Sequence, residues 1–63
     1  MARSQFCTMV DSAIKDEMAA DRMYRRTAMM TNNRTLRTII RSIARDERGH
    51  ARTWRTIRTL KCR

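Results

Sequence analysis

Apolar residues recur at alternating steps of four and three along two stretches of the chain, and this spacing places them on one face of an α-helix. In the first stretch that face carries Phe6, Val10, Ala13, Glu17, Ala20, Tyr24, Thr27 and Thr31. In the second it carries Leu36, Ile40, Ile43, Glu47, His50, Trp54, Ile57 and Lys61. The pattern predicts two amphipathic helices of similar layout, each with a carboxylate among apolar residues.

The two stretches are separated by the Thr-Asn-Asn segment at residues 31–33. Asparagine accepts turn and cap geometry, so Asn32 or Asn33 can end one helix and cap the next. We therefore expect a helix over residues 4–30, a turn over 31–33 and a helix over 34–60. The expected fold is an all-α antiparallel two-helix hairpin.

The chain is expected to form a single domain, 1–63, because it has no Pro, one Gly and no composition typical of a linker. Two helices in 63 residues bury too little surface to be stable alone. We therefore expect the hairpin to dimerise into a four-helix bundle. Met9, Met23 and Met30 recur every seven residues beside the first apolar face and are interpreted as interface residues, which leaves room for a larger oligomer.

The chain has only two Glu and one His, and all three occupy positions on the apolar faces. If the hairpin folds about residue 32, Glu17 and Glu47 are each fifteen residues from the turn and lie level with each other. Glu47 and His50 are three residues apart on a helix, so their side chains can reach one ion. The plainer alternatives are solvated or Arg-paired glutamates and a hydrogen-bonded core histidine.

Burial of an unpaired carboxylate costs several kcal/mol, so these glutamates need a compensating positive charge. One hairpin offers three ligands, whereas two hairpins offer four carboxylates and two neutral imidazoles. Two divalent cations balance four carboxylates. The sequence thus predicts a two-metal site between two chains.

At these residues the chain resembles the ferritin-like carboxylate proteins, particularly rubrerythrin-like proteins and encapsulated ferritins. The resemblance consists of Glu17, Tyr24 seven residues later, and the segment Glu47-Arg48-Gly49-His50-Ala51. Four-helix members take one Glu from each of two helices and Glu-x-x-His from each of the others. The resemblance implies that this chain is half of such a bundle.

By that resemblance Glu17, Glu47 and His50 would bind two iron ions per dimer, with Glu47 a candidate bridge between them. Tyr24 would be a hydrogen-bonding or redox neighbour of the site, or else a packed core residue, while Trp54 is expected in the core. The implied activity is that of a ferroxidase, an oxidoreductase that oxidises Fe(II), in iron storage or detoxification. Manganese suits the same oxygen and imidazole ligands.

The apolar runs and the end of the chain bear on where the protein is located and on whether its cysteines are reduced. The longest apolar runs are only a few residues, so no membrane span is expected. The chain ends at Lys61-Cys62-Arg63, without the targeting tail of encapsulated ferritins, and we expect a cytoplasmic protein. There, two reduced cysteines are favoured over a disulfide between Cys7 and Cys62.

The chain is strongly basic, with 15 Lys and Arg against 6 Asp and Glu and a net charge of +9. Eight arginines recur every three or four residues along the second helix: Arg34, Arg37, Arg41, Arg45, Arg48, Arg52, Arg55 and Arg58. They suit contact with a polyanion or an acidic protein, although an ordinary solvated face has the same pattern. The alternative function is thus a basic hairpin that binds nucleic acid, without a catalytic metal.

Overall fold

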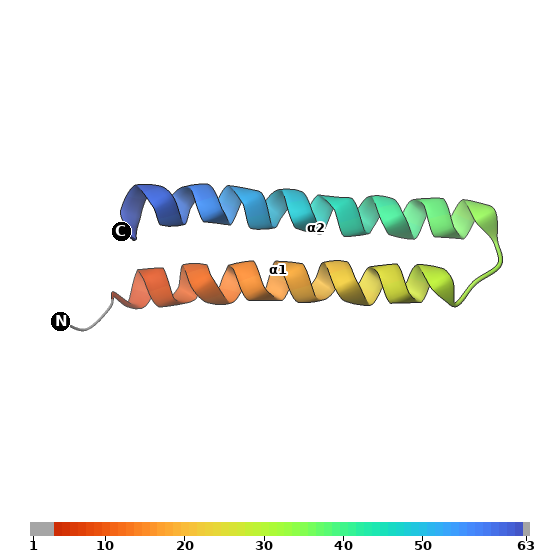
Figure 1. The fold of residues 1–63 in the computed structure, drawn as a ribbon, viewed down its shortest axis with the longest axis horizontal. Coiled ribbons are helices and arrows are strands. Elements are labelled where there is room, and N and C mark those ends of the chain that lie inside the picture. The colour runs from red at the N-terminus through yellow and green to blue at the C-terminus, as the bar shows by residue number, and fades with distance from the viewer. Residues whose placement is uncertain (1–3, 63) are drawn as a thin grey trace.

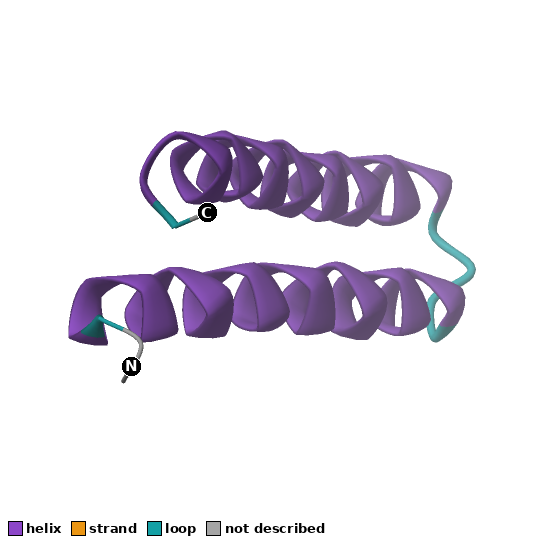
Figure 2. Cartoon of the chain, turned by 60° about the vertical axis from the view of Figure 1, so that its left-hand side comes forward, coloured by secondary structure: helices purple, strands orange, loops and turns teal. Residues whose placement is uncertain are grey.

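The computed structural model describes residues 4–62 and contains two helices, α1 (Gln5–Met29) and α2 (Arg34–Lys61). The helices run antiparallel and side by side, joined by a short connection at one end (Figures 1 and 2). Among the described residues there is no strand. The expected all-α hairpin is confirmed, and the helix boundaries differ from the expected ones by one residue at three of the four ends.

Each helix begins at a side-chain cap that satisfies a free backbone N–H group. The Ser4 hydroxyl accepts a hydrogen bond from the backbone N–H of Cys7 at 3.1 Å. The Asn33 side chain accepts one from the N–H of Leu36 at 3.0 Å, so Asn33, rather than Asn32, caps the second helix. These caps fix where the hairpin turns and therefore which residues face each other.

The two helices contact each other along a narrow line of buried residues. On α1 these are Cys7, Val10, Ile14, Asp21 and Ala28, and on α2 they are Ala44 and Ala51. Most of them are seven residues apart, the spacing of a coiled-coil contact. Val10 is the only member of the two expected apolar faces that is fully buried, because the contact line is rotated to one side of those faces.

At the open end of the hairpin, Cys7 and Cys62 form a disulfide with an S–S distance of 2.06 Å. The expectation of two reduced cysteines is therefore wrong for this structure. That expectation came from the reducing environment of the cytoplasm and took no account of geometry. The antiparallel pairing of the helices brings the two Cα atoms to 5.7 Å, within the range that a disulfide spans. The bond closes a loop of 55 residues and so restricts the unfolded chain.

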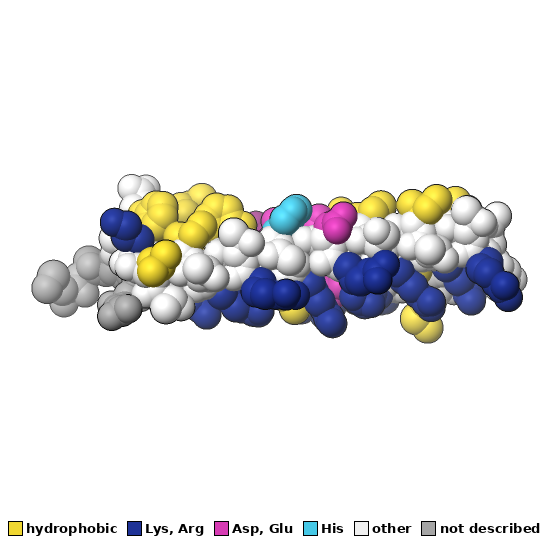
Figure 3. All heavy atoms as spheres, turned by 90° about the horizontal axis from the view of Figure 1, so that it is seen from above, with side chains coloured by type: hydrophobic (Ala, Val, Ile, Leu, Met, Phe, Trp, Pro, Cys, Tyr) yellow, Lys and Arg dark blue, Asp and Glu magenta, His cyan; other side chains and the backbone are white. Residues whose placement is uncertain are grey.

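The hairpin has two broad faces of opposite character, which lie along opposite edges in Figure 3. We call one the open face: it is the side of the contact line toward Glu17, Glu47 and His50, and by helical spacing it also carries the exposed Phe6, Met9, Leu36, Ile39 and Ile43. The other, the basic face, carries arginines of α2, among them Arg41, Arg45 and Arg48, together with Arg25 of α1. No described helix is both long and apolar enough to cross a membrane.

Candidate metal centre

Glu17, Glu47 and His50 come together at the middle of the open face. Each can place one ligand atom so that all three atoms lie within 4.8 Å of one another. His50 Nδ1 lies 3.3 Å from Glu17 Oε2, across the contact between α1 and α2. The geometry agrees with the expectation that Glu17 and Glu47 lie level in the hairpin and that the His50 imidazole lies with them.

The spacing of these ligand atoms is close to what one metal ion requires. Nitrogen and carboxylate oxygen ligands lie about 2.1 Å from a first-row ion, so two ligands of one ion are at most about 4.2 Å apart. The observed limit of 4.8 Å exceeds this by a few tenths of an ångström. Closing that gap requires rotation of these side chains, of which His50 is exposed to solvent.

The electrostatics of the cluster favour a cation. The pKa of Glu47 is raised above its usual 4.5, first by its hydrogen bond with the Glu17 carboxyl, then by partial burial and by the charge of Glu17. Asp46 raises it further, and only His50 acts in the opposite direction. A hydrogen bond between two carboxyl groups requires a shared proton. A divalent ion that displaced this proton would relieve the same repulsion.

The cluster is open on one side. The His50 side chain is 62 % exposed and the Glu17 side chain is 21 % exposed. The dry interior expected around these groups is therefore not formed by the single hairpin, because the contact line between the helices passes to one side of them. Exposed apolar side chains flank the cluster toward both ends of the hairpin (Figure 3).

The aromatic residues expected near the site are half-buried. Tyr24 is two helical turns from Glu17, about 10 Å along the axis. Within residues 4–62 no hydrogen bond joins its hydroxyl to the cluster. Trp54 is half-buried beside the contact line and not in the fully buried core expected for it. The structure thus brings together three of the four predicted site residues.

A second charged cluster is centred on Asp21, which lies on the contact line itself, and its two arginine partners lie toward the basic face. Asp21 is 1 % exposed and accepts hydrogen bonds from Arg25 Nε at 2.8 Å and Arg48 Nε at 3.2 Å. Burial tends to raise its pKa, but the two arginines outweigh burial and hold the pKa below the usual 3.8. The negative charge of Asp21 is therefore compensated within one chain.

Sequence patterns alone do not single out this cluster. The four-residue spacing of Asp21 and Arg25 is an ordinary sign of a helix ion pair. The available signal for burial was the seven-residue series Cys7, Ile14, Asp21 and Ala28, which marks the contact line. The partner from α2, Arg48, could only come from the alignment of the two helices.

Comparison of the chain with protein-family models, with curated proteins and with solved structures finds no match. The ferritin-like resemblance therefore depends on the spacing of the residues named above.

Proposed function

We propose that two copies of this chain pair through their open faces and bind two metal ions, as a ferroxidase that oxidises Fe(II) in iron storage or detoxification. The observation that carries this proposal is the meeting of Glu17, Glu47 and His50 on an exposed apolar face. Fe(II) is the substrate, and manganese is the alternative ion for the same ligands.

Pairing is supported by how little one hairpin buries. Three of the six buried apolar residues in the described part of the chain are alanines: Ala28, Ala44 and Ala51. In the same part of the chain nine large apolar side chains are exposed, several of them on the open face. The molecule measures 51 by 16 by 11 Å. Its broad face is therefore similar in area to the surface of about 800 Å² that each partner buries in a stable interface.

A second copy is the partner that also completes the charge balance. An open face brings two carboxylates and one neutral imidazole, and its symmetric mate brings the same set. Four carboxylates then surround two divalent ions in a site from which water is largely excluded. When bound, such ions would supply electrons to O₂ or peroxide, and the carboxylates would hold the more highly charged product.

The proposal is tested by anaerobic Fe(II) titration of the purified protein, with native mass spectrometry to count chains and metal ions together. We expect two iron ions per pair of chains, and oxidation on admission of O₂. Glu17→Gln and Glu47→Gln should abolish binding, as should His50→Ala. The matched controls are Asp16→Asn and Asp46→Asn, which remove the same charge one position away.

Three results would contradict the proposal. The first is the absence of binding at micromolar iron, and the second is retention of both ions in Glu17→Gln. The third is equal loss of binding in the control variants, because that would assign binding to the general acidity of the region. Binding of Mn(II) with no oxidation of Fe(II) would keep the site and reject the ferroxidase reaction.

A further inference from the structure

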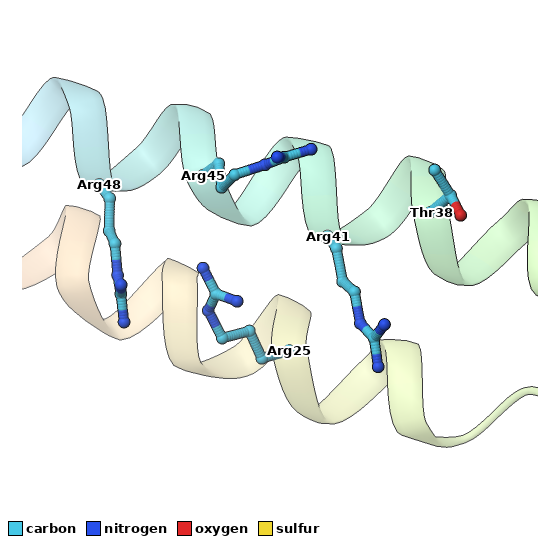
Figure 4. A pocket seen from close by; sticks show the side chains of 5 residues that line it. All are labelled: Arg25, Thr38, Arg41, Arg45 and Arg48. Atoms are coloured by element: carbon cyan, nitrogen blue, oxygen red, sulfur yellow. The ribbon is translucent and has the colours of Figure 1, made fainter.

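The basic face has a hollow in the half of the hairpin nearer the turn. A cavity of about 430 Å³ is lined by Arg25, Thr38, Arg41, Arg45 and Arg48. Arg41 and Arg48 reach from α2 toward α1, while Arg25 reaches from α1 toward α2 and Arg45 lies along α2 (Figure 4). Four guanidinium groups from both helices thus surround one space.

The charge of this cavity is not neutralised by the chain. Arg25 and Arg48 share Asp21, which binds each of them through Nε and leaves their terminal nitrogens as further donors. Within residues 4–62 no acidic side chain pairs with Arg41 or Arg45. Four guanidinium groups and one carboxylate leave a net charge of +3 around the cavity.

Asp21 also orients two of these donors. A guanidinium held by a buried carboxylate loses less side-chain entropy when it binds an anion, and its planar fork matches the oxygens of phosphate. Because Arg25 and Arg48 are 39 % and 55 % exposed, an anion in the cavity can reach them. The cavity is therefore arranged for phosphate groups.

The length and composition of the basic face indicate what kind of phosphate-bearing molecule fits it. Arg34 and Arg55 are 21 residues apart on α2, about 32 Å, which is a little less than one turn of B-DNA. Single-strand binders stack bases on aromatic side chains. The chain has one Phe, one Tyr and one Trp, and by helical spacing all three share a face with Glu17 or Glu47, away from the basic face.

From these observations we infer that the basic face binds the phosphate backbone of double-stranded nucleic acid, without sequence preference, with the arginine cavity at the centre of the contact. The face lies opposite the open face, so this binding does not depend on the proposed metal site. Contacts confined to phosphates carry no base information, which is why no sequence preference is expected.

Salt dependence gives a measurable expectation. Three neutralised phosphates, matching the net charge of +3, predict a slope of about −2.7 for log K against log salt. Binding to a 20-base-pair DNA duplex should thus weaken roughly 40-fold between 50 and 200 mM salt. Contacts from the remaining arginines of the face would make the slope steeper.

The test compares two double variants of the disulfide-bonded chain, each with two fewer positive charges. Arg41→Gln with Arg45→Gln alters the cavity, and Arg26→Gln with Lys61→Gln alters exposed residues elsewhere. We expect the cavity variant to lower the salt slope by about 2 and to weaken duplex binding roughly 60-fold at 100 mM salt. The control variant should change binding only a few-fold, and circular dichroism should show both variants helical.

The alternatives give different results. Equal weakening in both double variants would assign binding to net charge and reject the cavity as its centre. Tighter binding of single-stranded than of duplex DNA would reject double-stranded nucleic acid as the ligand. So would binding of tripolyphosphate without binding of the duplex. Glu17→Gln should bind the duplex as the unaltered chain does, so loss of the metal site and loss of this site can be told apart.

Discussion

Two carboxylate clusters lie one helical turn apart on α1, one on the line where α1 and α2 meet and the other beside it. On the line, Asp21 is buried and held by Arg25 and Arg48, which lie toward the basic face. On the open side, Glu17 and Glu47 lie against each other with one imidazole beside them. The pKa of Asp21 is lowered and that of Glu47 is raised, so the same chemical group is in opposite electrostatic situations.

The difference lies in what completes each cluster. A carboxylate that is buried with two guanidinium groups has its charge compensated, so its place in the structure is explained by stability alone. Two neighbouring carboxylates that raise the pKa of one of them have no such explanation within one chain. We interpret the first cluster as the group that aligns the helices, and the second is the metal site proposed above.

The largest effect on stability is expected from removing the charge of Asp21. Asp21→Asn should lower the free energy of unfolding by about 2 kcal/mol, because two charge-assisted hydrogen bonds are lost while both arginines keep solvent contact. Urea unfolding of the disulfide-bonded chain at neutral pH measures this. Asp16→Asn, on an exposed residue, removes the same charge and should change stability little.

The pH dependence of stability follows from the lowered pKa of Asp21. A depressed folded-state pKa gives stability that is present above the unfolded pKa, near 3.8, and is lost as pH falls through the folded value. The unaltered chain should therefore lose this contribution in acid, below about pH 4, and Asp21→Asn should not. Identical acid unfolding curves for the two proteins would contradict the role given to Asp21.

The second-largest effect is expected at Glu47, where the pH dependence of stability has the opposite sign to that at Asp21. Glu47 has a raised pKa, so its contribution to stability is present below the unfolded value of 4.5 and is lost as pH rises through the folded value. Without metal, Glu47→Gln should be more stable than the unaltered chain at neutral pH, and the difference should vanish in acid. Thermal unfolding in the presence of a chelator measures both.

Metal binding at this cluster should in turn release the shared proton. The affinity for Fe(II) should then fall about tenfold for each pH unit of acidification for each proton released, once the pH is below the folded pKa of Glu47. Anaerobic titrations at several pH values measure this dependence. A pH-independent affinity in that range would mean that the ion binds elsewhere, and the contrast between the two clusters would lose its functional meaning.

The hairpin could be predicted because helical periodicity and Asn33 are local signals. Glu17 and Glu47 could be placed level because their distances from the turn are equal, and the structure agrees. Two features could not be read in this way. Burial of Asp21 depends on how far each helix is rotated about its axis, and the Cys7–Cys62 bond depends on which ends meet. Both are relations between helices, and periodicity within one helix does not contain them.

The smallest effect concerns Gly49, which lies between the residues that serve the two clusters, Arg48 and His50. A Cβ atom added at Gly49 would meet nothing within 4 Å, so no close approach inside the hairpin requires glycine there. Gly49→Ala should therefore raise the free energy of unfolding by about 1 kcal/mol, through helix propensity alone.

The reverse change at an exposed position of α1, Ala19→Gly, provides the matched control and should lower stability by about the same amount. Melting temperatures should move by about 4–8 °C in opposite directions, with metal and duplex binding unchanged by Gly49→Ala. If Gly49→Ala instead weakened pairing of the chains while Ala19→Gly did not, a second copy would have to pack against the outer side of α2 at Gly49. Pairing would then not use the open face, and the proposed metal site between two chains would be contradicted.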